Sequence, residues 1–183
     1  RIFNMQGGGG ITIGSSILNN NTEIEVLIVS GAIRLDEYYM ELGNIQSLTK
    51  VTIANGSTYI AENFAYEYEY LRTVELPQSV AQIRSQAFKG SGVTYINLEN
   101  VTTINDEAFN NSKVSSITFS PDIVNIGQRA FGNIVNLTKV TMPDYLGAGN
   151  NMFEGSENII DLTIPSRQSL ATFGITIDNE SLT

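Results

Sequence analysis

Residues 65–70 read AYEYEY, so that three tyrosines, Tyr66, Tyr68 and Tyr70, alternate with two glutamates. Tyrosine offers a large, stiff and amphipathic contact area, and it is enriched where proteins bind partners. In a strand, this alternation would place all three rings on one side. The segment therefore raises the question of whether its tyrosines bind a partner or pack inside the fold.

The chain of 183 residues contains no Cys and no His. This composition excludes thiol catalysis, Ser-His-Asp triads and histidine general bases, and it removes nearly all zinc sites. Carboxylate pairs and Ser-Lys arrangements remain as catalytic alternatives, but no such pair has a spacing that brings it together. We therefore expect a protein that is not an enzyme and that carries no cofactor or metal ion.

Hydrophobic residues make up 42% of the chain and charged residues 16%, which is the composition of a folded protein. There are 19 acidic and 10 basic residues, and the net charge is −9. Nucleic acids and anionic membranes attract clustered Lys and Arg, so neither is an expected partner. No apolar run approaches the roughly 20 residues of a membrane-spanning helix, so we expect no membrane insertion of this segment.

A six-residue pattern with apolar residues at its first, fourth and sixth positions recurs along the chain. Its copies begin at Leu48, Leu71, Val93, Val114, Leu137 and Ile159, which are 23, 22, 21, 23 and 22 residues apart. An earlier copy begins at Ile24. A coil of this length cannot bury its apolar face alone, so successive coils must stack around a shared core. The fourth and sixth positions point to the same side of a short strand, which predicts a parallel sheet along one face.

Phenylalanine recurs in the second half of each period. The five positions are Phe64, Phe88, Phe109, Phe131 and Phe153, and Ala precedes three of them. We expect these rings to stack into one column, the structural spine, with the small Ala residues permitting close contact between coils.

The segments LRTVELPQSVAQIRSQAFKGS (71–91), VSSITFSPDIVNIGQRAF (114–131) and LTIPS (162–166) resemble the BspA-type leucine-rich repeat. One departure is the family's usual Cys three residues after Phe, which is Ser91, Ser112, Ile134 or Ser156 here. The resemblance implies a mainly β leucine-rich-repeat solenoid of about 22 residues per coil. Parallel strands would form one face, with turns and short helical or 3-10 segments on the other. It also implies an extracellular or cell-surface location.

The repeat frame divides the chain into three parts. Residues 1–23, rich in Gly and Asn, are expected to be a linker or an N-terminal cap. Residues 24–173 are expected to form the solenoid, with six to seven repeats. Residues 174–183 depart from the register and are expected to be a C-terminal cap or a truncated repeat.

The repeat frame places AYEYEY between Phe64 and the next strand, where other copies have turn sequences such as KGSG and NNSK. Tyr66, Tyr68 and Tyr70 are therefore candidates for a recognition patch on an edge turn, with packing as the favoured alternative. The outward side of the strands is the second candidate, and its most ligand-like residues are Glu75, Tyr95 and Asn97. Its many Thr residues are also explained by strand propensity.

These observations predict a non-enzymatic protein-binding or adhesion module of a cell-surface or secreted protein. The family's usual role implies a protein partner, such as a host or extracellular matrix protein. Two alternatives stay open: a structural spacer within a larger surface protein, and a carbohydrate-binding module that would bind a glycan.

Overall fold

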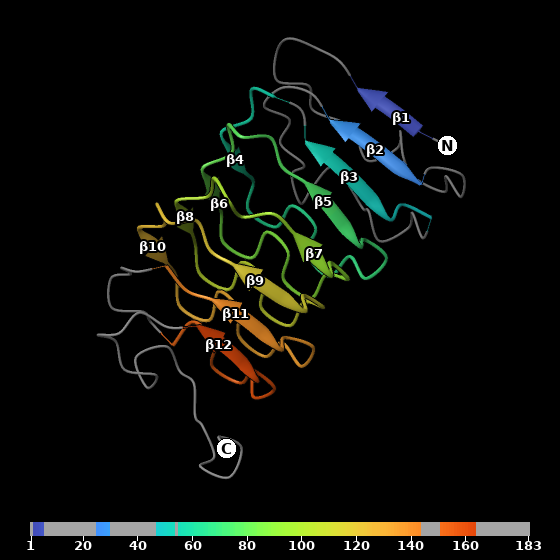
Figure 1. The fold of residues 1–183 in the computed structure, drawn as a ribbon. Coiled ribbons are helices and arrows are strands. Elements are labelled where there is room, and N and C mark those ends of the chain that lie inside the picture. Colours follow the sequence, from blue (N-terminus) through green and yellow to red (C-terminus); the bar gives the residue numbers. More distant parts are fainter. Residues whose placement is uncertain (1, 6–24, 30–46, 54, 144–150, 164–183) are drawn as a thin grey trace.

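The computed structural model describes residues 2–5, 25–29, 47–53, 55–143 and 151–163. They form a parallel β-solenoid of about five turns, with about 23 residues per coil (Figure 1). The predicted solenoid is confirmed. The short helical segments expected on its back are absent from the described residues, where a second set of strands and a stack of turns are found instead.

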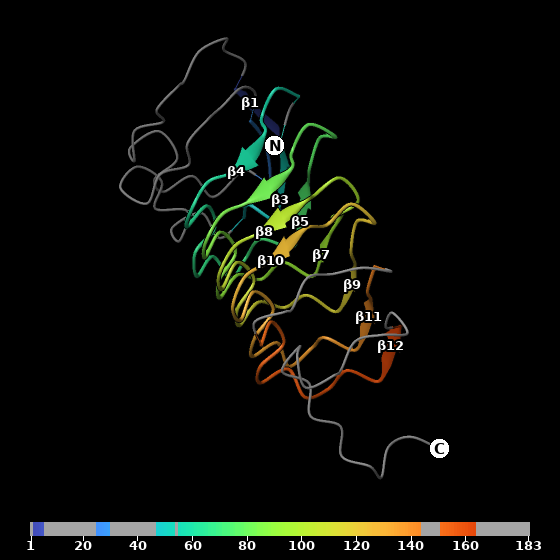
Figure 2. The same ribbon diagram turned by 90° about the vertical axis from the view of Figure 1, so that its left-hand side faces the viewer.

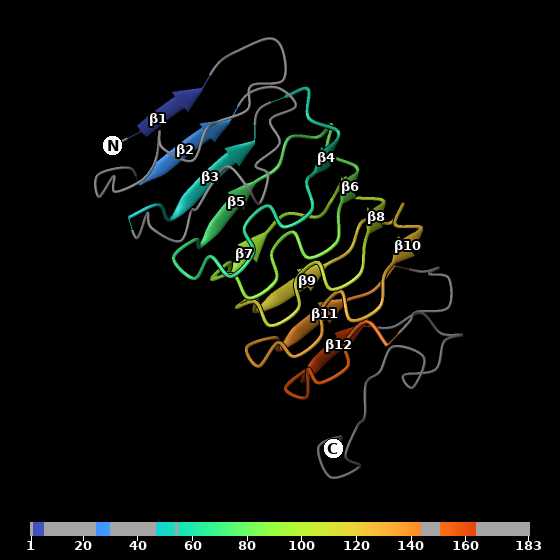
Figure 3. The same cartoon turned by 180° about the vertical axis from the view of Figure 1, so that it is seen from behind.

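The first face of the solenoid carries two parallel sheets in one row, which Figures 1 and 3 show from opposite sides. The five-stranded sheet contains β1 (Ile2–Met5), β2 (Val26–Val29), β3 (Lys50–Ile53), β5 (Thr73–Glu75) and β7 (Tyr95–Ile96). The three-stranded sheet contains β9 (Ser116–Thr118), β11 (Lys139–Thr141) and β12 (Asp161–Thr163). A bridge between Leu98 and Phe119 links the two sheets beside β7 and β9.

A separate sheet of four short strands lies on another side of each coil (Figure 2). Its members are β4 (Tyr59–Ile60), β6 (Gln82–Ile83), β8 (Thr103–Ile104) and β10 (Asn125–Ile126). Each strand is only two residues long and ends on a buried Ile. The Ile that recurs before each phenylalanine therefore points inward from this sheet.

Stacked turns close the third side of the coil. The backbone N–H of Phe88 donates to Ala108 O at 2.7 Å, and that of Phe109 donates to Ala130 O at 2.7 Å. Gln86, Glu107 and Arg129 each begin such a turn with a positive φ of 50 to 56°. This left-handed conformation costs a non-Gly residue of the order of 1–2 kcal/mol. The hydrogen bonds between coils offset that cost.

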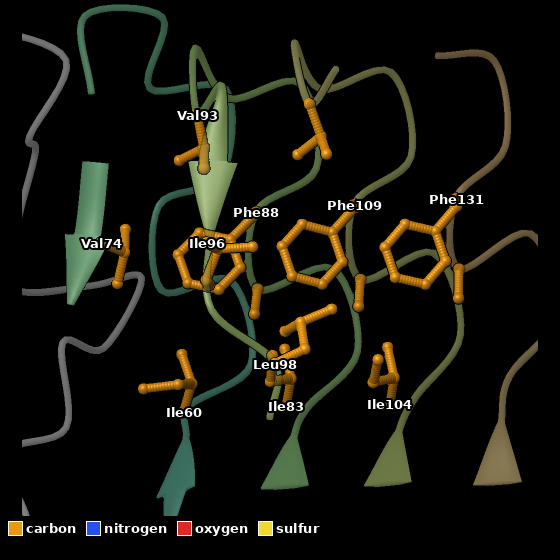
Figure 4. Packing of buried hydrophobic residues seen from close by; sticks show 14 of the residues in the cluster. Ile60, Val74, Ile83, Phe88, Val93, Ile96, Leu98, Ile104, Phe109 and Phe131 are labelled. Carbon is orange, nitrogen blue, oxygen red and sulfur yellow. The ribbon is translucent and has the colours of Figure 1, made fainter. Parts of the chain in front are cut away.

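Phenylalanine rings stack along the inside of these turns (Figure 4). The ring centroids of Phe88 and Phe109 are 5.1 Å apart, and those of Phe109 and Phe131 are 5.0 Å apart, with interplanar angles of 16° and 6°. Phe153 continues the column at 5.9 Å from Phe131. All of these side chains are fully buried.

The coil that contains β3 and β4 departs from the order of residues expected at this column. Ala65, and not Phe64, donates its backbone N–H to the next coil in the way that Phe88 does, because Ala65 N bonds to Ala87 O at 2.6 Å. The prediction that Phe64 occupies the same backbone slot as Phe88 is therefore wrong by one residue. The Phe64 ring still reaches Phe88, but it meets that ring edge-on, at 5.7 Å and 62°.

The sheet begins earlier than the expected solenoid boundary at residue 24. Ile2–Met5 pairs in parallel with Val26–Val29, and Ile2 lies opposite Val26. This strand lies within the segment predicted to be a linker or an N-terminal cap. Residues 6–24 lie outside the described part of the chain, as do residues 164–183, which include the predicted C-terminal cap or truncated repeat at 174–183.

Replacing the central ring of the column tests its contribution to stability. Phe109→Ala should lower the free energy of unfolding by roughly 3–5 kcal/mol, because the cavity lies between two stacked rings. Phe109→Leu, which keeps most of the volume, should cost clearly less. Urea unfolding followed by circular dichroism measures both variants, and an unchanged midpoint for Phe109→Ala would show that the column does not stabilise the fold.

Candidate functional site

The three tyrosines of AYEYEY lie in a turn, not in a strand, and their environments differ. The side chain of Tyr68 is 1% exposed, whereas those of Tyr66 and Tyr70 are 38% and 37% exposed. The Tyr68 hydroxyl donates a hydrogen bond to Leu48 O at 3.0 Å, and its ring meets Tyr70 at 6.1 Å between centroids. Burial raises the pKa of the Tyr68 hydroxyl well above its usual range, and the nearby Tyr70 adds to this effect.

The backbone explains why Tyr68 points inward. Tyr68 N bonds to Ala65 O as Ser91 N bonds to Phe88 O, so Tyr68 occupies the slot of Ser91, which is also buried. In this coil a small Ala stands in the phenylalanine slot and a large Tyr stands in the serine slot. The buried Phe64 stands in the slot that Ala87 fills in the next coil, so Phe and Ala are inverted and the large Tyr68 adds volume to the core of this coil. The inclusion of Tyr68 in a recognition patch is therefore wrong, and only Tyr66 and Tyr70 contribute exposed area to this edge.

In the later coils the slot of Tyr68 holds Ser91, Ser112, Ile134 and Ser156, and the hydroxyls of its serines are satisfied unevenly. The buried hydroxyls of Ser91 and Ser112 have no hydrogen-bond partner, whereas Ser156 Oγ donates to Phe131 O at 2.7 Å and accepts from Ile134 N at 2.8 Å. These serines are buried, so they offer a ligand nothing at the surface.

The outer side of the first face presents the alternate residues that the strand period places outward. They are half-buried or exposed in every described strand of this face from β3 to β12. These outward residues are Lys50, Thr52, Thr73, Glu75, Tyr95, Asn97, Ser116, Thr118, Lys139, Thr141, Asp161 and Thr163.

Two ion pairs on this side join neighbouring strands. Lys50 Nζ lies 2.5 Å from Glu75 Oε1, and Thr52 Oγ1 donates to the other Glu75 oxygen at 2.9 Å. The hydrogen bonds from Lys50 and Thr52 lower the pKa of the Glu75 carboxyl. Lys139 Nζ lies 2.5 Å from Asp161 Oδ2. Glu75 is therefore an already paired carboxylate, and a partner would meet it as part of an ion pair.

An uncharged stretch separates the two ion pairs. It consists of Tyr95, Asn97, Ser116 and Thr118 on β7, β9 and the residue after β7, and we call it the Tyr95 window. Tyr95 is 57% exposed, more than any other tyrosine of the described residues. Asn97 Oδ1 accepts a hydrogen bond from Glu99 N at 3.0 Å. The window thus offers one aromatic ring among hydroxyl and amide groups, which suits contact with an uncharged polar surface.

The turn side carries a ladder of charges that the sequence interpretation did not single out. Glu107 lies 2.6 Å from Lys89 and accepts from Gln86 at 2.8 Å, and Arg129 pairs with Glu154 at 2.6 Å. The hydrogen bonds from Lys89 and Gln86 lower the pKa of Glu107, as the bond from Arg129 does for Glu154. The available signal was the recurrence of opposite charges about one coil apart. Because each charge is paired within the solenoid, this side is a weaker candidate for binding.

The described residues contain no cluster of three or more acidic side chains that could hold a metal ion. The same part of the chain contains no helix with the length and apolar character needed to cross a bilayer.

Comparison with family models matches residues 9–92 and 39–160 to the BspA type leucine-rich repeat region, a model of six copies. The matched segments cover more than half of the sequence. The chain belongs to this family. The expected BspA-type character is thereby confirmed, and the leucine-rich repeats of this family, like its solenoid fold, are generally non-enzymatic and commonly bind proteins. A comparison with curated proteins finds no significant match.

Two solved structures of leucine-rich repeat proteins are similar to this chain in fold. A leucine-rich repeat protein from Bacteroides ovatus ATCC 8483 is 22% identical, with a TM-score of 0.60, over 76% of this chain and 40% of that chain. The T. pallidum leucine-rich repeat protein is 21% identical, with a TM-score of 0.61, over 90% of this chain and 75% of that chain. This chain thus spans less than half of the Bacteroides protein. At these identities the likeness shows the fold.

Two single substitutions separate packing from exposure in AYEYEY. Tyr68→Ser should destabilise the protein by roughly 3 kcal/mol or more, because it empties a buried volume and leaves Leu48 O without its phenol donor. Tyr66→Ser should change stability by less than about 0.5 kcal/mol, as is usual for exposed positions. Thermal unfolding measures both, and equal losses would contradict the assignment of Tyr68 to the core.

The turn-side ladder predicts a pH dependence of stability. The pKa of Glu107 is lowered on folding, so its pairing stabilises the protein above the ordinary glutamate value of 4.5 and loses this effect as pH falls through the lowered folded value. Glu107→Gln should therefore cost up to about 1 kcal/mol at neutral pH, the range of partly exposed pairs, and progressively less in acid. Urea unfolding of the parent chain and of Glu107→Gln, at neutral pH and in acid, measures how much stability the substitution costs at each pH. An equal loss of stability at neutral and acidic pH would assign the effect to packing.

Proposed function

We propose that the chain is a non-enzymatic protein-binding module of a cell-surface or secreted protein, and that the Tyr95 window is the centre of its contact surface. The observation that carries this proposal is the position of Tyr95, whose side chain is 57% exposed on the outer side of the first face, between two ion pairs. Tyrosine is a frequent hot-spot residue because it buries a large area at low entropic cost. The usual role of the family, together with this ring, supports an extracellular protein as the partner.

The size of the window sets how much of the face must take part. Neighbouring strands are about 4.8 Å apart, so the two strands of the window form a narrow band. A standard protein interface covers about 800 Å² on each partner. Contact must therefore extend over the flanking pairs Lys50–Glu75 and Lys139–Asp161, which would form a charged but internally neutralised rim.

The two alternatives make different demands on this surface. A spacer needs no exposed ring and would tolerate any polar residue at position 95. A carbohydrate-binding module would use the ring for stacking and Asn97 or Ser116 for hydrogen bonds, over a much smaller area. A protein partner is favoured because the row of mostly polar outward residues continues beyond the window, from β3 to β12.

A binding screen tests the proposed contact surface. The purified chain is applied to an array of extracellular proteins and glycans, together with Tyr95→Ser and with Tyr66→Ser as a matched exposed-tyrosine control. We expect a saturable protein ligand whose affinity falls about 30-fold or more in Tyr95→Ser, the effect of losing a hot spot of about 2 kcal/mol. Tyr66→Ser should leave that affinity unchanged.

The other outcomes of the screen are equally informative. Loss of binding in Tyr66→Ser alone would move the site to the edge formed by Tyr66 and Tyr70. A glycan ligand lost in Tyr95→Ser would replace the protein partner by a carbohydrate. The absence of any ligand for the folded chain would favour the spacer.

A further inference from the structure

The corner between β3 and β4 carries the dipeptide Asn55-Gly56, which occurs only once in the sequence. Both residues are exposed and lie in a turn. Gly56 has a φ of +105°, and apart from Gly56 and its two chain neighbours no residue has an atom within 4 Å of the position that a Cβ would take. No side chain of its own covers the backbone nitrogen of residue 56, and the space beside its Cα is open.

We propose that Asn55 is a site of spontaneous modification, at which the asparagine side chain reacts with the backbone of Gly56. The Gly56 nitrogen attacks the Asn55 side-chain carbonyl carbon and forms a new C–N bond. The bond between that carbon and the amide nitrogen breaks, and ammonia leaves with the proton lost by the Gly56 nitrogen. Water then opens the resulting five-membered imide at either carbonyl, which gives an aspartate or an isoaspartate at position 55.

The surroundings distinguish Asn55 from other exposed asparagines of the described chain. Three of these, Asn100, Asn111 and Asn133, are followed by a buried residue whose backbone N–H is already hydrogen-bonded. The donor–acceptor distances are 3.0 Å for Val101, 3.0 Å for Ser112 and 2.8 Å for Ile134. An N–H held in a bond of normal length, with a bulky side chain beside it, is poorly placed to attack the asparagine before it.

The N–H of Gly56 is held more weakly. Its one acceptor is Ser79 Oγ, at 3.4 Å, which is longer than a typical N–H···O bond. The same hydroxyl donates to Ser57 O at 2.8 Å, so Ser79 ties this corner to the next coil. Ser79 therefore acts as a restraint on the reaction, and its removal should free the Gly56 nitrogen.

The product alters the corner in two ways. An isoaspartate routes the main chain through the former side chain and so lengthens the backbone between β3 and β4 by one atom. Either product also adds a carboxylate to a chain of net charge −9. Lys50 and Thr52, which hold Glu75, lie on the strand that enters this corner. The reaction would thus act on one coil at one side of the solenoid and leave the Phe88–Phe131 column in place.

Peptide mapping by mass spectrometry after incubation of the folded chain at mildly alkaline pH tests the proposal. Asn55 should convert about tenfold faster than Asn100, Asn111 or Asn133, which corresponds to an activation barrier lower by about 1.4 kcal/mol. Fragmentation that separates aspartate from isoaspartate should detect both products at position 55. Asn55→Gln should remove the fast-forming acidic species from isoelectric focusing, whereas Asn100→Gln should not.

Ser79→Ala separates the role of the fold from that of the dipeptide. The variant should convert faster at Asn55 than the parent chain does, while the three control asparagines keep their rates. A rate at Asn55 equal to that of Asn100 in the folded parent chain would overturn the modification site. An unchanged rate in Ser79→Ala, with its fold intact by circular dichroism, would overturn the restraint.

Discussion

The stacking of each coil on the next at a nearly constant period is the constraint on which the rest of the structure depends. Backbone hydrogen bonds join neighbouring coils on three sides, as in Thr94 N to Arg72 O, Gly127 N to Ile104 O and Phe109 N to Ala130 O. The rings of Phe88, Phe109 and Phe131 repeat at 5.0 to 5.1 Å, close to the roughly 4.8 Å between strands. Side-chain stacking and backbone pairing therefore require the same spacing, and neither strains the other.

The repeat period was sufficient to predict the solenoid and the strands of the first face, because inward apolar residues such as Val51 and Val74 recur in register. The four-stranded sheet of β4, β6, β8 and β10 was not predicted, since strands of two residues are too short to show an alternation. The inversion of Phe64 and Ala65, with Tyr68 in the serine slot, was also missed. Its signal was present in the inverted order Phe-Ala where other coils have Ala-Phe, but only the backbone hydrogen bonds reveal which residue stands in which slot.

The candidate site was predictable in position and less so in chemistry. The strand alternation placed Glu75, Tyr95 and Asn97 on the outer side, where the structure has them. Their bonding depends on contacts between coils, which a single period does not reveal. Glu75 accepts hydrogen bonds from Lys50 and Thr52 of the preceding strand. The side-chain oxygen of Asn97 accepts a hydrogen bond from Glu99 N in a local turn. Tyr95 is thus the residue of this set with the greatest area left for a partner.

The cations of the described chain are used mainly to join coils. Lys50, Lys89, Arg129 and Lys139 each pair with an acid of the following coil, Arg84 lies over the Tyr59 ring at 3.8 Å, and Arg72 Nη1 donates to Gly92 O at 3.2 Å. The excess of acidic residues is consequently left at exposed corners and turns, which include Glu62, Glu69, Glu99 and Asp122. At long range the solenoid presents a negative field that favours approach of a basic partner and weakens with salt. At contact, the Tyr95 window is uncharged, so the field would set the rate of encounter while the ring and its polar neighbours set the lifetime of the complex.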